Sequence, residues 1–446
     1  MKRFITLLLV IVFVISMLFI SVGCKKAVTT ETTAAATTAA QETTGAAETT
    51  ATATTAAETT ANKGEIVVAA IDSRIITLEP FAKEFTEKTG IKVTFQSIPS
   101  GEPLPMYATY WINGVSPYDV CEVDDGTVIG VGTPGWLLPL NDIIPAETWD
   151  DFTPSIMERM NIWDKYQGNF IRIPHSAELQ YVYVRKDLLD AKGLAVPTTW
   201  DEMVNVGKEF AKENIWGTVD ALGKGGMCFV YISYLVGQAG GDVFAFDEGT
   251  AEAFKFVYDM INTYKIFPKD AISYTYDELN LAYTKDRVIM IRQWPYARDV
   301  FMGDKAWYSP DKVTIVLPPK GPANNKSWMT SWGWSIPKYA KNIEGAKEFI
   351  KFITSNDVQS RLALVASDFV VTRKSVFAAM GDKGITPYLK MYDEAGAIGN
   401  RPYHLKVNEA QEIVENMLHS YLLGEITLDE AMKQGKSLIE ALGPRE

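Results

Sequence analysis

The apolar positions along the chain predict strands and helices that alternate from residue 64 onward. Residues 66–71 are almost all apolar, which is typical of a strand buried on both faces. An apolar helical stripe follows at 78–85 and stops before Gly90, and residues 91–95 then alternate as a second strand. A strand, a helix and a strand in this order predict a parallel sheet with helices on its faces.

Acidic and aromatic residues follow several of the predicted strands. Asp72 follows the first strand, Asp124 and Asp125 end a further short strand predicted at 117–125, and Trp294 follows a buried strand at 288–291. Ligands of parallel sheets gather at the carboxyl ends of the strands, so Asp72 and Trp294 are candidate ligand-binding residues. For Asp72, capping of the following helix is an equally good explanation.

The segment 327–337 contains three tryptophans within seven residues and ends in a proline. Trp332 and Trp334 are two residues apart, so on a strand they share one face, while Gly333 leaves the other face bare. A bare glycine allows another group to approach the backbone closely. Packing in the core explains any single tryptophan equally well, but for the cluster we favour a wall that faces a ligand.

Glu178 lies in an apolar and aromatic stretch between residues 171 and 189. A carboxylate in such a setting either pairs locally or faces a pocket, and we favour the pocket. Replacing Glu178 or Trp332 by alanine is therefore expected to weaken ligand binding without unfolding the protein.

Helix starts can be recognised at three places. Thr199 and Glu202 have the spacing of a capping box, as do Thr427 and Glu430, and Asn342 offers an N-cap. Apolar residues at helical spacing follow each of them, so a helix is predicted after each cap.

The composition is that of a globular protein large enough for two domains, with 446 residues, 47% of them hydrophobic and 22% charged. A net charge of −12 argues against a nucleic-acid partner, which requires a basic face. Cys121 and Cys228 are interpreted as ordinary buried thiols. The three histidines lack the spacing of metal ligands, so we expect neither a metal nor a cofactor.

The N-terminal residues 1–23 are interpreted as a signal peptide, because two basic residues precede a long apolar run and small residues. The run meets Cys24 in a sequence that resembles a bacterial lipobox, so Cys24 is the predicted site of lipid attachment. An uncleaved membrane anchor is the alternative. Residues 24–63 are rich in Thr and Ala and are predicted to form a disordered tether. Either way, the folded part is expected outside the cytoplasm, held at a membrane.

Common enzyme motifs do not account for the chain. Residues 130–135 match the dinucleotide fingerprint G-x-G-x-x-G, but Pro134 and the residues after it do not open an amphipathic helix. No G-x-S-x-G motif is present, and no nucleophile is paired with a base in the sequence. These absences do not exclude glycosidase chemistry, which needs only carboxylates. Our expectation that the protein is not an enzyme rests on the resemblance of the whole chain to a known family.

The order of these segments resembles that of family 1 extracellular solute-binding proteins, the lipoprotein components of ABC importers for sugars. No single segment is specific, but their order and spacing together are. The segments that carry the resemblance are 66–95, 118–120, 135–140, 178–189, 197–202, 332–352 and 424–431.

The resemblance implies an α/β fold of the periplasmic-binding type, with two lobes that close on a ligand by hinge motion. Each lobe would be a mostly parallel sheet flanked by helices. The ranges implied are 64–176 and 297–355 for the N-terminal lobe, and 181–292 and 360–446 for the C-terminal lobe. The chain would cross between the lobes near 174–180, 292–296 and 354–361.

The resemblance also implies which residues line the ligand pocket and which partners the protein has. The candidate residues are Asp72, Asp124 or Asp125, Glu178, Trp294 and Trp332, with Tyr403 as a further candidate from the second lobe. The implied partners are a small carbohydrate and an ABC permease, with the membrane reached through the N-terminal lipid, and the protein is expected to be a monomer.

Tryptophans and carboxylates together suit a neutral sugar, because an indole covers the C–H face of the ring and carboxylates accept from its hydroxyls. The same groups would suit a cation such as a polyamine. A glycosidase that uses two carboxylates, such as Asp124 and Glu178, is a further alternative. A surface adhesin, which would lack a buried cleft between lobes, is the third.

Overall fold

The computed structural model describes residues 64–98, 103–304, 306–370 and 372–445, all of which belong to one compact unit. The predicted signal peptide 1–23, Cys24 and the tether 24–63 lie outside these residues. Within the described ranges, no helix is both long and apolar enough to cross a membrane.

The first sheet contains the predicted strand–helix–strand unit. Strand β1 (Glu65–Ile71) pairs in parallel with β2 (Lys92–Ile98) and with β3 (Val120–Asp124). Helix α2 (Asp72–Thr89) connects β1 to β2 and ends at Gly90, which has the left-handed φ of 78° that favours glycine. The predicted strands and helix are therefore confirmed.

Three further strands complete the first sheet, whose order is β12-β11-β3-β1-β2 with β6 also paired to β11. Strand β11 (Ser327–Ser335) is antiparallel to β3 and to β6 (Ile173–Leu179), and parallel to β12 (Ile398–Asn400). The tryptophan segment is thus a central strand, buried along its length.

The second sheet has the order β10-β7-β9-β8. Its strands are β7 (Tyr181–Arg185), β8 (Trp216–Val219), β9 (Val288–Gln293) and β10 (Val313–Val316). Only β8 and β9 are parallel here, whereas β7 is antiparallel to both of its neighbours. Both sheets are therefore mixed, and the parallel pairing that we predicted holds for β1 with β2 and β3, β11 with β12, and β8 with β9.

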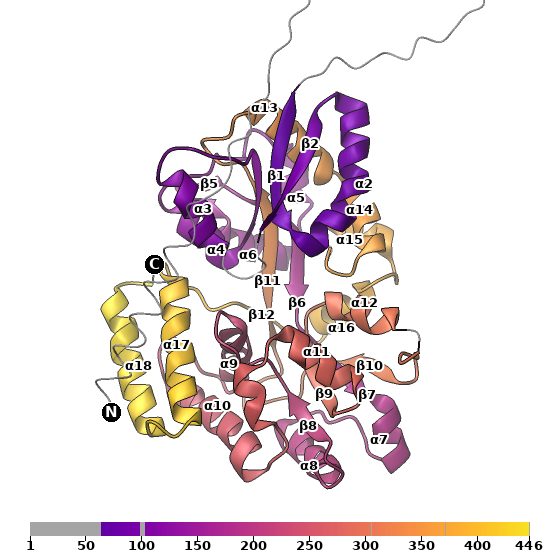
Figure 1. Cartoon of the computed structure of the whole chain (residues 1–446), viewed down its shortest axis with the longest axis vertical. Coiled ribbons are helices and arrows are strands. Elements are labelled where there is room, and N and C mark those ends of the chain that lie inside the picture. Colours follow the sequence, from indigo (N-terminus) through magenta and orange to yellow (C-terminus); the bar gives the residue numbers. More distant parts are fainter. Residues whose placement is uncertain (1–63, 99–102, 305, 371, 446) are drawn as a thin grey trace, which may run out of the picture. The chain divides into compact units, whose positions relative to one another are not determined.

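The chain passes from the first sheet to the second at Gln180, the single residue between β6 and β7 (Figure 1). It returns to the first sheet between β10 and β11, over residues 317–326, which is later than the passage we predicted near 292–296. The reason is that β10 pairs with the free edge of β7. Strand β10 therefore belongs to the second sheet, although its residues fall in the range 297–355 that we predicted for the N-terminal lobe.

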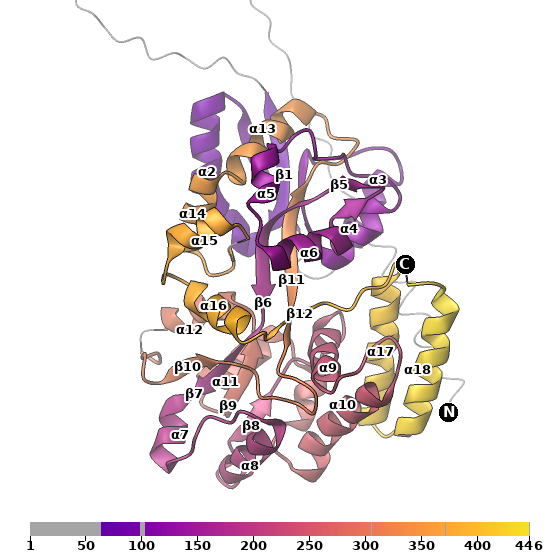
Figure 2. The same cartoon turned by 180° about the vertical axis from the view of Figure 1, so that it is seen from behind.

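Helices pack around both sheets. Helix α13 (Ile343–Ile353) contacts α2 and β1, and α14 (Asn356–Val365) packs on α2. Helices α17 (Val407–Leu422) and α18 (Leu428–Leu442) lie side by side and contact α9 (Met227–Gln238) and α10 (Glu248–Tyr258), as Figures 1 and 2 show.

The remaining elements are shorter. They are α3 (Leu104–Trp111), α4 (Asp125–Gly132), α5 (Ala146–Asp150), α6 (Pro154–Trp163), β4 (Lys165–Tyr166), β5 (Asn169–Phe170), α7 (Lys186–Lys192), α8 (Trp200–Ala211), the π-helix η1 (Asp259–Thr263), the 3-10 helix η2 (Lys269–Ser273), α11 (Tyr276–Thr284), α12 (Tyr296–Gly303), α15 (Lys374–Met380) and α16 (Thr386–Glu394).

The three predicted N-caps are confirmed, but Thr199 and Glu202 do not form the full capping box that we predicted, because the Glu202 carboxylate accepts from the N–H of Thr198. The Thr199 and Asn342 side chains accept hydrogen bonds from the N–H groups of Glu202 and Gly345. Thr427 and Glu430 form a complete capping box at the start of α18. Cys121 and Cys228 are buried free thiols, as predicted.

Candidate functional site

Asp124 and Asp125 lie at the carboxyl end of β3 but have different surroundings. The Asp124 carboxylate accepts from the N–H groups of Gly126 and Thr127 and so caps α4, and its side chain is 23% exposed. Asp125 is fully buried, with Oδ1 at 2.8 Å from Arg172 Nη2 and Oδ2 at 2.9 Å from Thr330 Oγ1. Asp124 is thus the one of the two that can reach a ligand.

Asp125, the first residue of α4, belongs to a buried network that ties α4, α6 and β11 together. Arg159 and Arg172 both form ion pairs with Asp125, and Arg172 also pairs with the buried Asp164. Burial and the neighbouring Arg172 charge lower the pKa of Arg159 to about 9. Breaking such a buried network is costly, so Asp125 has a structural role.

Asp72 is the first residue of α2, directly after β1. Its side chain is exposed and does not cap the helix, because the N-cap position is Ile71 and no side-chain hydrogen bond closes this end. Among the residues that the structure describes, Asp72 takes part in none of the contacts that gather the other candidates.

Glu178 is paired with a buried arginine. Arg74, on the first turn of α2, forms ion pairs with Glu122 on β3, with Glu178 on β6 and with Asp368. The Nη1–Glu122 Oε1 distance is 2.6 Å and the Nε–Asp368 Oδ2 distance is 3.5 Å. His175 Nε2 lies 2.8 Å from the same Glu122 oxygen. The single positive charge of the Arg74 guanidinium is therefore shared by three carboxylates.

This imbalance of charge separates the pKa values of the three acids. Burial raises the pKa of Glu178 to about 7, because desolvation, helped by the nearby Asp368 charge, is larger than the opposing effect of the Arg74 charge. Burial also raises the pKa of Asp368. For Glu122, burial is overcome by the Arg74 charge and by hydrogen bonds from His175 and the Ile71 N–H, which lower the pKa to about 2. The cluster can hold a proton near neutral pH.

Trp332 borders this cluster and is 8% exposed. The Arg74 guanidinium carbon lies 5.0 Å from the centroid of its ring. Trp334 is fully buried and stacks on His175, with ring centroids 4.7 Å apart. The close approach that we predicted at Gly333 is that of strand β6, because an added Cβ would lie 2.6 Å from the Ile173 carbonyl oxygen. Gly333 and Trp334 therefore pack against protein and not against a ligand.

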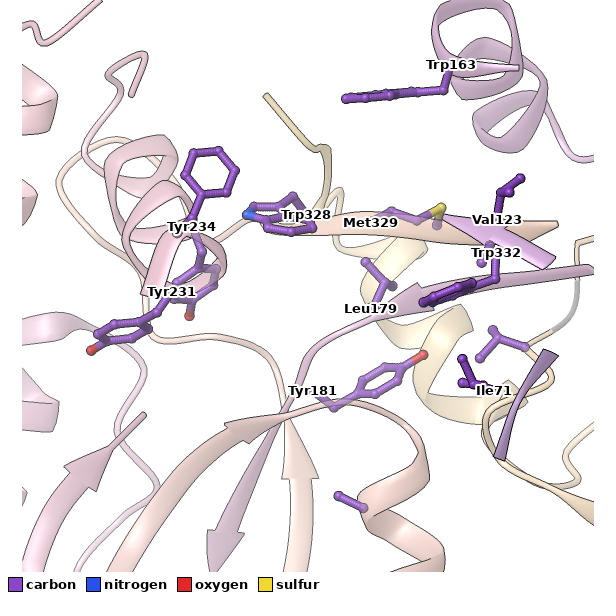
Figure 3. Close-up of a cluster of buried hydrophobic side chains, with 14 of the residues drawn as sticks. Ile71, Val123, Trp163, Leu179, Tyr181, Tyr231, Tyr234, Trp328, Met329 and Trp332 are labelled. Carbon is purple, nitrogen blue, oxygen red and sulfur yellow. The ribbon is translucent and has the colours of Figure 1, made fainter. Parts of the chain in front are cut away.

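A second group of aromatic rings lies where both sheets contribute residues. Trp294, which follows β9 and is half-buried, has its ring 6.2 Å from that of Trp328 at the start of β11. Trp328 Nε1 donates to Ser233 Oγ of α9 at 2.9 Å. Figure 3 shows Trp328 on the side of helix α9, which carries Tyr231 and Tyr234, with Trp332 farther along the same strand.

Arg401 connects this aromatic group to the first sheet. Its Nη1 lies 3.5 Å from Asp124 Oδ2, and its guanidinium lies about 6 Å from the rings of Trp163, Phe229 and Trp328. Tyr403 packs edge-to-face on Trp163, with ring centroids 5.1 Å apart. The predicted residues Asp124 and Tyr403 thus lie around Trp163 and Arg401, and Trp294 reaches them through Trp328.

Arg74, Asp368, Arg401 and Trp328 were not among the predicted site residues. Arg74 follows Asp72 at the edge predicted to bind ligands, and Trp328 belongs to the tryptophan segment, so both had a signal in the sequence. Asp368 and Arg401 had none, because their partners lie hundreds of residues away along the chain.

Comparisons with known proteins agree with this architecture. A family model described as bacterial extracellular solute-binding protein matches residues 72–360. A probable ABC transporter-binding protein of Deinococcus radiodurans is 26% identical over 315 residues, which cover 64% of this chain and 70% of the relative. A mannitol-binding protein of Pseudomonas aeruginosa is 25% identical over 249 residues, covering 50% of this chain and 53% of the relative.

Among solved structures, maltose-bound MalE3 of T. maritima is similar to this chain with a TM-score of 0.76 at 23% identity, covering 85% of this chain and 100% of that one. The fold is thus the two-lobe α/β fold of periplasmic binding proteins. The chain belongs to the bacterial extracellular solute-binding protein family, and it is a substrate-binding protein of the ABC-transporter type. The family resemblance predicted from the sequence motifs is confirmed.

Proposed function

We propose that this protein is a membrane-anchored lipoprotein that captures a carbohydrate, an oligosaccharide in particular, outside the cytoplasm and delivers it to an ABC permease. The observation that carries the proposal is a group of aromatic rings around Arg401, the residue that also pairs with the Asp124 carboxylate. Trp328 lies at Arg401, Trp294 packs on Trp328, and Tyr403 packs on Trp163. Aromatic rings of this kind cover the C–H face of a sugar, and a carboxylate accepts from its hydroxyls. The names of related proteins, which include a mannitol-binding protein and a maltose complex, support a polyol or sugar as the ligand.

The lipid anchor is the part of the proposal that rests on the sequence alone. Cys24 after residues 1–23 would carry the lipid, and residues 24–63 would hold the folded part clear of the membrane surface. Replacing Cys24 by Ser should release the protein from the membrane fraction of expressing bacteria. Retention of the Cys24→Ser variant at the membrane would argue for an uncleaved anchor instead.

The decisive experiment measures thermal unfolding of the full-length protein with a panel of ligands: maltose, maltotriose, D-mannitol, ribitol and spermidine. A ligand present at 100 times its dissociation constant adds about 2.7 kcal/mol to the free energy of unfolding and raises Tm. A shift with a sugar or polyol supports the proposal. A shift with spermidine alone would overturn it in favour of a polyamine carrier, which Arg401 disfavours by placing a positive charge among the aromatic rings.

A glycosidase would need two carboxylates set on either side of a bond. Here the Glu178 carboxylate is held in an ion pair with the buried Arg74, so of these two acids only Asp124 is left to face a ligand. One carboxylate does not make the pair that the reaction requires. Incubation of the protein with maltotriose should therefore leave the sugar intact, and the appearance of maltose or glucose would contradict a purely binding role.

A further inference from the structure

A charged pair lies at the carboxyl ends of the parallel strands in the second sheet. Asp220 follows β8 directly, and Arg292 is the penultimate residue of β9. Arg292 Nε donates to Asp220 Oδ2 at 3.1 Å, and both residues are buried. Because ligands of α/β sheets bind at this edge, the pair occupies a position suited to a ligand group.

A cavity of about 30 Å³ adjoins the pair, between the second sheet and helices α8 and α9. Asp220, Arg292, Val182, Tyr231 and Tyr234 are among its lining residues. The rings of Tyr234 and Tyr231 lie 4.3 and 5.2 Å from the Arg292 guanidinium carbon and fix its plane. A space of this size holds one small group, such as a hydroxyl or a water molecule.

Arg292 has a donor that the described part of the chain leaves unpartnered. The residue is 5% exposed, and Nη2 has no hydrogen-bond partner among the described residues, although Nε is bonded to Asp220. A buried guanidinium donor without a partner is costly, so such a group is expected to meet an acceptor in the working protein.

Gln180 supplies a second set of unpartnered atoms. It is 1% exposed, and within the described ranges neither its side-chain oxygen nor its nitrogen forms a hydrogen bond. It lies two residues before Val182, which pairs with Arg292 across β7 and β9 and lines the cavity. Gln180 directly precedes β7 and is not itself among the residues that line the cavity. Alternation along an extended chain places its side chain on the same side as that of Val182, next to the cavity.

We propose that Gln180, Asp220 and Arg292 form a subsite that binds one hydroxyl group of the carbohydrate. The inference rests on the proposed function, and it specifies that these side chains recognise a hydroxyl group of the bound sugar. A hydroxyl both donates and accepts, and these side chains offer an amide donor and acceptor, a guanidinium donor and a carboxylate acceptor. Asp220 already balances the Arg292 charge, so the subsite favours a neutral group. Its volume admits one substituent and not a whole ring, which makes it a determinant of specificity.

The affinity test uses Gln180→Met and Arg292→Lys in the full-length protein, titrated calorimetrically with each member of the ligand panel. Methionine keeps the volume of glutamine without its polar atoms, and lysine keeps a positive charge beside Asp220. The affinity for the best-bound sugar should fall about 3- to 10-fold in Gln180→Met and by more than about 10-fold in Arg292→Lys, following the strengths of neutral and charged hydrogen bonds.

The matched control is Gln238→Met. Gln238 is fully buried on α9, but its Oε1 accepts from Trp200 Nε1 at 2.8 Å and its Nε2 donates to the Lys326 carbonyl at 3.3 Å. In urea unfolding without sugar, Gln238→Met should therefore lose stability and keep its affinity. Gln180→Met should keep the wild-type midpoint or exceed it, because it removes polar atoms that have no partner.

Two outcomes would overturn the subsite and leave the proposed function standing. In the first, the wild-type protein binds a sugar, and Gln180→Met and Arg292→Lys bind it with the same affinity. In the second, Gln180→Met loses as much stability as Gln238→Met. The second result would mean that the amide is satisfied by a buried water only. If no sugar or polyol of the panel binds the wild-type protein, the proposed function fails and the subsite fails with it.

Discussion

Arg74 of α2 holds its guanidinium carbon 5.0 Å from the centroid of the Trp332 ring on β11. The same guanidinium forms ion pairs with Glu122, Glu178 and Asp368, so the indole covers a charge that is shared inside the protein. The indole face over Arg74 is not available to a sugar ring. Within the candidate site, the half-buried Trp294 is the better placed of the two tryptophans to stack on a ligand.

Replacing Arg74 by methionine should strongly destabilise the protein. The change leaves the buried Glu122 and Glu178 and the partly exposed Asp368 beside each other without a counter-charge. Loss of one partner from a buried ion pair costs about 3–5 kcal/mol. Urea unfolding at pH 7 measures the loss. The control is Arg361→Met, because Arg361 pairs with Glu84 and Asp357 at the surface, where a pair contributes about 1 kcal/mol or less. Equal losses in the two variants would contradict the central role of Arg74.

The stability of the protein should depend on the protonation of Glu178. Its pKa is about 7 in the folded protein against 4.5 as the ordinary value, so the folded state binds more protons than the unfolded state between these two pH values. The free energy of unfolding should therefore fall as the pH rises from about 4.5 to 7, by about 1.4 kcal/mol for each unit of pKa difference at most.

Glu178→Gln removes this titration and should flatten that part of the curve. Urea unfolding of both proteins at pH 5.0 and pH 7.5 measures the difference. An unchanged slope in Glu178→Gln would show that Arg74 keeps Glu178 ionised over the whole range.

Local patterns were sufficient to predict much of the fold. The apolar run of β1, the stripe of α2 and the capping box before α18 depend on neighbours within a few residues, and these elements form where they were predicted. Strand β10 was missed as part of the second sheet, because its assignment depends on the free edge of β7.

The candidate site was harder to predict than the fold. A carboxylate at the end of a strand is visible in the sequence, but whether it faces a ligand depends on partners far along the chain. Asp124 and Asp125 are adjacent, yet only the second meets Arg159 and Arg172. Glu178 was expected to face a pocket, and the sequence contains no sign that Arg74 reaches it across 104 positions. Ion pairing of buried acids is a tertiary property.

Gly333→Ala should destabilise the first sheet. An added Cβ would lie 2.6 Å from the carbonyl oxygen and 2.9 Å from the carbonyl carbon of Ile173, and a strand backbone cannot move aside as a flexible side chain can. Overpacking of this kind costs about 1–3 kcal/mol. The control is Gly237→Ala on α9, where nothing lies within 4 Å of the added atom and alanine is favoured over glycine by up to about 1 kcal/mol. Thermal unfolding of both variants should show shifts of opposite sign, and equal shifts would contradict the close approach of β6.

Trp332→Ala and Trp294→Ala should separate stability from binding. The sequence alone suggested that Trp332→Ala would weaken binding without unfolding the protein. Because Trp332 is 8% exposed and covers Arg74, its removal leaves a cavity and uncovers a buried charge, and truncation of a buried tryptophan costs about 3–5 kcal/mol. Trp294 is half-buried at the carboxyl end of β9, so its truncation should cost less stability and more affinity. Urea unfolding and calorimetric titration with the best-bound sugar measure both quantities for each variant. If Trp332→Ala instead keeps the wild-type stability and loses affinity, Trp332 and not Trp294 is the tryptophan that stacks on the ligand.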